Sequence, residues 1–220
     1  MERERFIELI RRSINDDLVF EAFRSIDRAD FIESEMGRNF AYKNRTIDLG
    51  EGSSISEPVL VAQMMENLHL TGREKVLEIG TASGYGAALL SKCAREVYTM
   101  EYNQNLAQKA SKRLKKLNID NVQVVIGDGA LGIPEASPFD AIIITAACRD
   151  FPPALVEQLV EGGRILAPIG KDPRFLELTL GLKTYGRLFY SKPITHCHFH
   201  PLVSEEKGGF SKDYLERLLG

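Results

Sequence analysis

Small residues connect an apolar segment to a helical one in Gly80-Thr-Ala-Ser-Gly84-Tyr-Gly86. The apolar residues before this turn predict a buried strand, and the residues after it have helical spacing. Glycine and other small residues let a ligand approach the backbone closely, and the free amides at a helix start can donate hydrogen bonds to it. The segment is therefore a candidate ligand-binding turn, although tight strand-to-helix turns also need glycine for purely structural reasons.

Acidic side chains stand at the ends of the next two predicted strands. Glu101 ends the first of them, and Asp128, followed by Gly129, ends the second. In an open parallel sheet the ligand crevice lies at the carboxyl ends of the strands, where an acidic side chain can accept hydrogen bonds from ribose hydroxyls. Three strand ends would thus carry polar groups that face one crevice.

The spacing of the glycines bears on the class of cofactor. A nicotinamide dinucleotide needs the pattern G-x-G-x-x-G, but here its three positions read Gly80, Ala82 and Tyr85. S-adenosylmethionine has no phosphate and tolerates this change. Glu78, two residues before Gly80, also matches the acidic-x-Gly-x-Gly-x-Gly pattern of class I methyltransferases, with Ala82 in place of the middle glycine.

Strands and helices alternate from residue 75 onward, which predicts βαβ units, right-handed crossovers and a mainly parallel, doubly wound Rossmann-like sheet with helices on both faces. The predicted strands are 75–80, 96–101, 122–128, 139–147 and 163–170. The predicted helices are 84–94, 103–117 and 152–160, the last one stopped by Gly162-Gly163. A hairpin over 175–190, turning at Tyr185-Gly186, and a strand over 194–203 predict an antiparallel edge.

The residues before this sheet predict a helical subdomain. The first 50 residues have apolar stripes at helical spacing, and Asn15 or Asp16 could cap a helix. Residues 45–58 have no helical period and predict a loop, after which Pro58 can open a helix that continues to Leu70. We therefore expect helices and a loop over 1–58, packed on a cofactor-binding domain over 59–220 as one structural unit.

Taken together, these segments resemble the protein-L-isoaspartate O-methyltransferase family, whose members depend on S-adenosylmethionine. The resemblance is carried by VLEIGTASGYGAALLSK, GDGALGIPEASPFDAIIITAA, LVEGGRILAPIG, AYKNRTIDLGEGSSISEPVLVAQMMENL and CHFHPL, and it runs from about residue 16 to 203. It implies methyl transfer to the free carboxylate of isoaspartyl residues in damaged proteins, followed by collapse of the ester to a succinimide without the enzyme. It implies no metal.

The resemblance also implies roles for individual residues. Ser56 would be the active-site serine, and the substrate would bind at Ser54, Ile55, Ser56 and Val203. Ser83 and Gly84 would touch the cofactor, Glu101 would bind its ribose, and Asp128 with Gly129 would contact the adenine side. The glycine pattern adds Glu78 and Gly80 to the residues expected at the cofactor.

Several residues depart from the family's pattern, namely Glu57, Ala82, Gly86, His198 and His200. A carboxylate at position 57 beside the acceptor site could repel an anionic substrate. Two other functions therefore stay open: a related carboxyl methyltransferase with another acceptor, such as an aspartate in a specific peptide, or a cofactor-binding protein without catalysis.

Other clusters have both a functional and a structural interpretation. The alternation of His196, His198 and His200 would put all three on one face of a strand, where they could bind zinc or simply belong to the strand. Cys148, at a predicted strand end, could be a nucleophile or a small packing residue. The basic residues Lys109, Lys112, Arg113, Lys115 and Lys116 could form a solvated helix face or a site for an acidic partner.

The overall composition limits the classes of partner. The 220 residues carry a formal net charge of −3, which gives no support for phosphate-driven binding to nucleic acid. Three widely spaced cysteines favour a reducing cytoplasm over a disulfide framework. The first residues do not have the pattern of a signal peptide, and no apolar run has the length of a membrane span.

Overall fold

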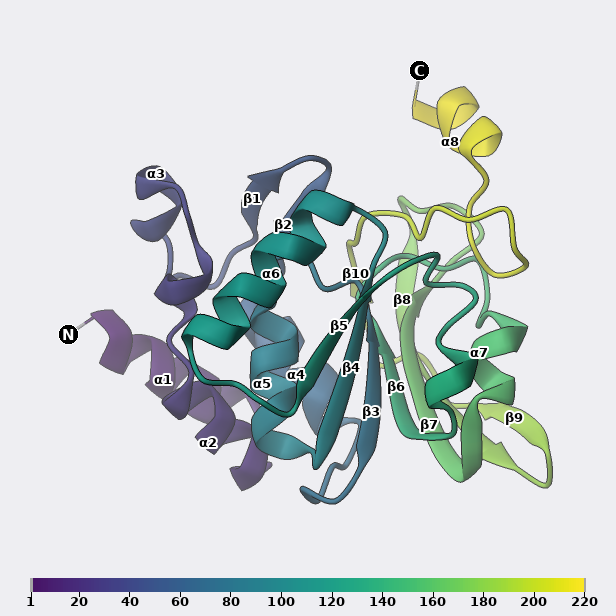
Figure 1. Ribbon diagram of the computed structural model, residues 1–220, viewed down its shortest axis with the longest axis horizontal. Helices are drawn as coiled ribbons and strands as arrows, with labels where there is room; N and C mark the ends of the chain where they lie inside the picture. The colour runs from purple at the N-terminus through teal and green to yellow at the C-terminus, as the bar shows by residue number, and fades with distance from the viewer. Residues whose placement is uncertain (1, 220) are drawn as a thin grey trace.

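Five parallel strands form the centre of the computed structural model, which describes residues 2–219 (Figure 1). In spatial order they are β5 (Val122–Ile126), β4 (Glu96–Glu101), β3 (Lys75–Ile79), β6 (Phe139–Ile144) and β7 (Leu159–Ile169). Because the chain order reverses beside β3, the carboxyl ends of β3 and β6 mark the switch point at which such sheets bind ligands. The mainly parallel Rossmann-like sheet predicted from the sequence is confirmed.

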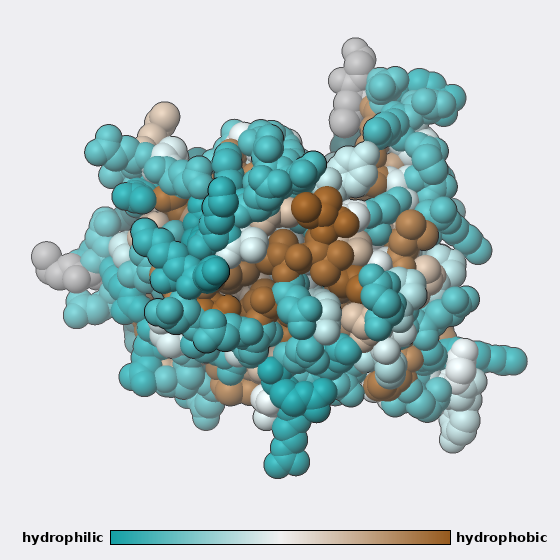
Figure 2. Space-filling model, in the orientation of Figure 1, coloured by the Kyte–Doolittle hydropathy of each residue, from teal (hydrophilic) through white to brown (hydrophobic). Residues whose placement is uncertain are grey.

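Antiparallel strands complete the sheet next to β7. They are β8 (Leu176–Thr184), which pairs with β7, then β9 (Arg187–Tyr190) and β10 (Thr195–Cys197), which both pair with β8. At the opposite edge lies β5, where Figure 2 shows an apolar surface in the middle of the view and Ile126 is half exposed. The antiparallel pairings of β8 with β7 and β9 confirm the predicted antiparallel edge and the hairpin at Tyr185-Gly186.

Helices cover both faces of the sheet, as Figure 1 shows. On one face lie α4 (Pro58–Glu66), α5 (Tyr85–Cys93) and α6 (Gln104–Lys116), with Pro58 in the first turn of α4 and Asn103 capping α6. On the other face lie α7 (Pro153–Glu157) and the short 3₁₀ helix η2 (Pro134–Ala136). Alternate strand residues serve the two faces, so Val76 packs in the first core and Leu77 in the second.

The N-terminal elements extend the first of these cores. They are α1 (Glu2–Ser13), α2 (Asp17–Ser25), η1 (Arg28–Phe31) and α3 (Glu35–Arg38). Apolar residues of α1 and α2 pack against α4 and α5. Asp16 caps α2 by accepting hydrogen bonds from the amides of Leu18 and Val19 at 2.8 and 3.0 Å, as predicted.

Four element predictions need correction. The segment 45–58 is not entirely loop, because it contains a hairpin of β1 (Ile47–Gly50) and β2 (Ser53–Ile55). The helix predicted for 152–160 ends at Glu157, since β7 starts at Leu159 and takes up the glycine pair expected to stop that helix. The helix expected to reach Leu70 ends at Glu66, and the strand predicted for 194–203 is reduced to β10.

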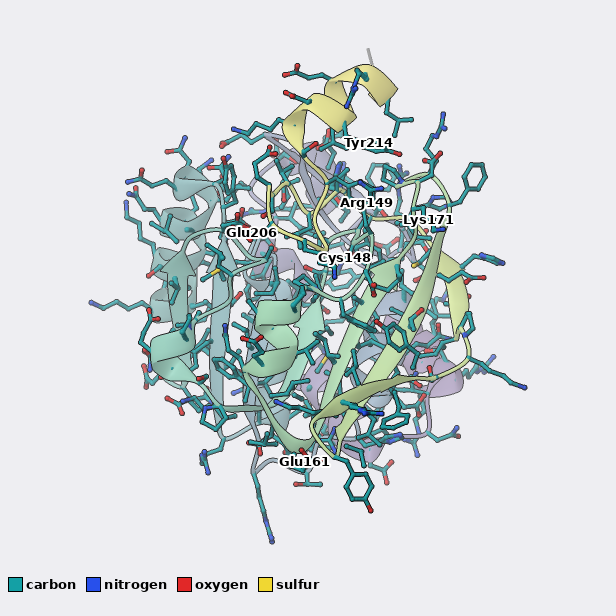
Figure 3. All side chains as sticks on the ribbon, turned by 90° about the vertical axis from the view of Figure 1, so that its right-hand side faces the viewer. Cys148, Arg149, Glu161, Lys171, Glu206 and Tyr214 are labelled. Atoms are coloured by element: carbon teal, nitrogen blue, oxygen red, sulfur yellow. The ribbon has the colours of Figure 1, made fainter. Side chains whose placement is uncertain are left out.

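The C-terminal helix α8 (Lys212–Leu219) stands out from the body of the molecule (Figure 3). Tyr214 points back toward the sheet, and its hydroxyl donates to the carbonyl of Lys171 at 3.3 Å. The guanidinium of Arg149 lies 5.3 Å from the centre of the Tyr214 ring. Within residues 2–219, no helix combines the length and the apolar character needed to cross a membrane.

Candidate active site

A cavity of about 910 Å³ opens at the carboxyl ends of β3, β4 and β6. Its walls include the glycine turn after β3, the β1–β2 hairpin, the segment from the end of β4 to the start of α6, and residues 198–203. The predicted site residues that line it are Ser54, Ile55, Ser56, Glu78, Gly80, Ser83, Glu101, Gly129 and Val203. Parallel-strand topology thus brings together residues that lie far apart in the sequence.

The glycine turn has a backbone that only small residues allow. Gly80 has φ +102°, and a Cβ atom there would lie 2.4 Å from Oγ1 of Thr145. That hydroxyl is itself fixed, because it lies within hydrogen-bonding distance of the carbonyls of Ile79 and Gly80, at 3.0 and 2.9 Å. The turn therefore keeps its backbone close to the cavity and leaves the space above it open.

Glu101 is held in place by main-chain amides at both of its carboxylate oxygens. Oε2 accepts the amide of Ala82 at 2.8 Å, and Oε1 accepts the amide of Asn103 at 2.9 Å. The carboxylate therefore joins the glycine turn to the start of α6. Each oxygen retains further lone-pair capacity toward the cavity, which suits hydrogen bonds from a ligand diol.

Glu78 lies deeper, with only 1% of its surface exposed. Burial raises the pKa of Glu78 to about 8, and the charge of Glu101 acts in the same direction, whereas the hydrogen bond from Thr99 opposes both. The Thr99 hydroxyl donates to Oε2 of Glu78 at 2.6 Å. A Cβ atom on Gly86 would lie 2.2 Å from Oε1 of Glu78, so Gly86 makes room for this carboxyl group.

The serines predicted to contact the substrate lie on or just after the β1–β2 hairpin. Ile55 is buried, while Ser54 and Ser56 line the cavity on either side of it. The carbonyl of Ser56 accepts a hydrogen bond of 3.1 Å from Arg28. Val203 lines the same cavity from the C-terminal segment.

Two predicted cofactor residues do not line this cavity. Gly84 is the N-cap of α5 with φ +87°, and a Cβ atom there would lie 3.3 Å from Cβ of Ala110. Asp128 accepts a 2.7 Å hydrogen bond from Ser204 and lines a second cavity of about 610 Å³. Met100 borders both cavities, so Asp128 is a neighbour of the site across that side chain.

Sequence reasoning missed several residues that shape the site, above all Thr145, Asn103 and Arg28. Thr145 lies near the end of the predicted strand 139–147 and Asn103 lies two residues after the predicted strand 96–101, so their place near strand ends was a usable signal. Arg28 gave none, because its acceptors are carbonyls of residues 41, 43, 45 and 56.

The histidines and Cys148 do not form a second catalytic centre in the described chain. Since β10 ends at Cys197, the prediction that His196, His198 and His200 share one strand face is wrong, and only the last two line the cavity. Across residues 2–219 there is no group of three or more His, Cys, Asp and Glu side chains that could hold a metal. Cys148 is fully buried and its burial raises the pKa of the thiol, which disfavours the nucleophilic thiolate.

Comparison with known proteins gives consistent matches. The family model described as protein-L-isoaspartate(D-aspartate) O-methyltransferase matches residues 2–207. A protein-L-isoaspartate O-methyltransferase of Geobacter metallireducens is 42% identical over 205 residues, covering 92% of this chain and 94% of that one. One from Shewanella amazonensis is 40% identical over 197 residues, covering 90% of this chain and 92% of that one.

Solved structures agree with these sequence matches. A protein-L-isoaspartate O-methyltransferase structure has a TM-score of 0.84 at 30% identity and covers 93% of this chain and 67% of that one. A Plasmodium falciparum structure, described as such an enzyme in complex with S-adenosyl-L-homocysteine, has a TM-score of 0.77 and covers 91% of this chain and 98% of that one. At 22% identity the latter supports the fold alone.

Proposed function

Because the chain belongs to the protein-L-isoaspartate(D-aspartate) O-methyltransferase family, we propose that it transfers a methyl group from S-adenosylmethionine to the free carboxylate of L-isoaspartyl residues. The observation that carries the proposal is one cavity with two kinds of wall. The wall formed by the glycine turn and Glu101 suits a nucleoside cofactor. The wall formed by the hairpin and Ser54–Ser56 suits the substrate. Methylation would start the repair of damaged proteins or peptides through a succinimide.

The residues present fit S-adenosylmethionine. Glu101, fixed by two amides, would accept hydrogen bonds from the ribose hydroxyls, while Gly80 and Ser83 would let the cofactor lie against the backbone. Gly129 lines the first cavity and Asp128 lines the second, with Met100 bordering both. Gly129 and Asp128 would contact the adenine part of the cofactor. When bound, the cofactor supplies an electrophilic methyl group on a sulfonium.

The protein's own residues have an orienting task in this reaction. An acceptor carboxylate has a pKa of about 4 and is ionised at neutral pH, so no strong general base is needed. What the site must do is align the acceptor and exclude water. Ser56, at the cavity wall with its carbonyl fixed by Arg28, would hold the acceptor carboxylate through its hydroxyl.

The proposed partners are isoaspartyl-containing proteins or peptides, and not nucleic acid or membranes. A formal net charge of −3 offers no general attraction to phosphate. We propose a cytoplasmic location, since Cys93, Cys148 and Cys197 are all free thiols.

A second candidate is a related carboxyl methyltransferase with a different acceptor. It is favoured by His198 and His200, which line the cavity and depart from the family's pattern. Glu57, next to Ser56, adds a carboxylate near the acceptor side. A cofactor-binding protein without catalysis is the third possibility.

One experiment separates the three functions. The purified protein is incubated with radiolabelled S-adenosylmethionine and either an isoaspartyl peptide or its normal aspartyl twin. We expect label as a base-labile ester on the isoaspartyl peptide alone. Label on the aspartyl twin alone would support the second candidate, and binding of the cofactor with no label on either peptide or on a damaged protein mixture would support the third.

A further inference from the structure

The tip of the β1–β2 hairpin is an unusually open turn. Gly50, Glu51 and Gly52 are three consecutive left-handed residues, with φ of 74°, 54° and 70°. A Cβ atom on either glycine would meet nothing within 4 Å. A left-handed backbone is disfavoured for glutamate, and contacts of the Glu51 side chain that stabilise the turn help to offset this cost.

The side chain of Glu51 fastens this tip to the start and the first turns of α6. Its Oε2 accepts a hydrogen bond of 2.9 Å from Nδ2 of Asn103, and its Oε1 lies 3.5 Å from Nζ of Lys109. Asn103 is itself fixed, since its main-chain amide donates to Glu101 and its side-chain Oδ1 accepts hydrogen bonds from the first amides of α6. The hairpin tip is thereby connected to the carboxylate proposed to bind ribose.

A second acidic residue extends the same network. Glu33 lies 2.6 Å from Arg113 and 4.0 Å from Lys109, and Arg113 also donates to the carbonyl of Ser83 in the glycine turn at 2.6 Å. Two members of the basic run on α6 therefore find their acidic partners within the chain itself. The network ties the hairpin, the N-terminal segment and the glycine turn to one helix.

We propose that Lys109 and Asn103 are positioning residues for methyl transfer, which act through Glu51 to hold the β1–β2 hairpin, with Ser54–Ser56, over the cavity. Glu51 and Asn103 both line the cavity, and their hydrogen bond of 2.9 Å connects the hairpin to the start of α6 there. The role in methyl transfer rests on the proposed function, whereas the role of the hairpin contact in cofactor release does not.

The ion pair between Lys109 and Glu51 is weak enough for the β1–β2 hairpin to open as well as close over the cavity. The side chains of Lys109 and Glu51 are 49% and 36% exposed, so their attraction is weak and screened by salt. The hairpin can then move away from α6 to exchange the cofactor and return to order the serines. Cofactor release should accordingly speed up as the ionic strength rises.

The test uses the full chain with two variants, Glu51→Gln and Lys109→Met, and their combination. Radiolabelled S-adenosylhomocysteine is bound and then displaced by excess S-adenosylmethionine. We expect each single variant to release it roughly 2- to 5-fold faster than wild type at low salt, with a smaller response to added salt. We expect the combined variant to behave like Lys109→Met alone, because that substitution already removes the cationic partner of Glu51.

Lys112→Met is the matched control, because Lys112 is exposed on the same helix and has no ion pair among residues 2–219. Equal acceleration in this variant, unchanged release in Lys109→Met, or additive effects in the combined variant would each overturn the proposal. The single-turnover rate on an isoaspartyl peptide should fall by a similar factor in Lys109→Met, with an unchanged thermal midpoint. If wild type releases cofactor as expected but methylates no isoaspartyl peptide, the proposed function fails and the closure stands.

Discussion

Glu101 is the residue whose chemistry and geometry agree most directly. Its position at the end of β4 could be predicted, and the structure adds the two amides that fix its carboxylate. We expect Glu101→Ala to weaken S-adenosylhomocysteine binding by about 1.5–3 kcal/mol, the scale of hydrogen bonds to a charged acceptor. Calorimetric titration measures this loss, and Glu101→Gln should show a smaller one. A variant that binds like wild type would remove the ribose role.

Ser56 should act by orientation, since an ionised acceptor needs no deprotonation. We expect Ser56→Ala to lower the single-turnover methylation rate by roughly 10- to 1000-fold, the effect of losing one oriented contact. The affinity for S-adenosylhomocysteine should change little. Equal losses in rate and affinity would make Ser56 a cofactor ligand instead, and a methylated serine found by mass spectrometry would contradict direct transfer.

The predictability of individual site residues follows from how each one reaches the cavity. Gly80 and Glu101 are placed by strand ends, which a βαβ pattern locates from the sequence. Asp128 is also at a strand end, yet its side chain turns to Ser204, a residue 76 positions away that no local pattern indicates. Arg28 likewise depends on carbonyls supplied by distant segments.

At the scale of elements, the apolar strands of the main sheet were predictable and the short β1–β2 hairpin was not. The central strands β3 and β6 have runs of buried residues that specify a sheet interior. The hairpin over 47–55 has strands of four and three residues around a glycine turn, so its periodicity is too short to recognise. The glycine pair 162–163 looked like a helix stop, but β7 continues through it beside the irregular pairing with β6.

The packing of β3, β4 and α5 around Glu78 should make the stability of the fold depend on pH. Glu78 on β3 is enclosed by Thr99 of β4 and Gly86 of α5, and its pKa is raised from 4.5 to about 8. Between these two values the unfolded chain loses the proton while the folded protein keeps it. This group therefore makes the folded state progressively less stable as the pH rises from about 4.5 to 8, by at most about 1.4 kcal/mol per pH unit.

We expect Glu78→Gln to remove this contribution. The free energy of unfolding of the ligand-free proteins is measured in urea. The value for the variant minus the value for wild type should increase as the pH is raised from 5 to 8, and it should level off above pH 8. A difference that stays constant over this range would show that Glu78 ionises normally in the folded protein.

At the scale of the whole molecule, the N-terminal helices and the sheet share one core. Phe23 of α2 and Phe31 of η1 pack against Tyr85 of α5 with ring centres 6.2 and 5.4 Å apart. We propose on this basis that residues 1–58 and 59–220 unfold as one unit. Sequence patterns indicated helices here, but the side chain that connects them to the hairpin could not be foreseen.

That side chain is Arg28, which is fully buried and donates to four carbonyls, those of Ala41, Lys43, Arg45 and Ser56. Burial lowers the pKa of Arg28 to about 10, which still leaves it charged at neutral pH. Arg28→Met would leave these carbonyls without their donor, at an expected cost of about 3–5 kcal/mol in unfolding free energy. Arg28→Lys, with three donors on a shorter reach, should lose less.

Urea unfolding of wild type and both variants, followed by far- and near-ultraviolet circular dichroism, tests this prediction. Because Arg28 connects the N-terminal helices to the end of the hairpin, its loss should shift one cooperative transition seen equally by both signals. If near-ultraviolet signals changed first and most helix and strand signal persisted, the N-terminal region would unfold separately. In that case Arg28 would stabilise only its own subdomain, and the shared core would not make the chain a single unit.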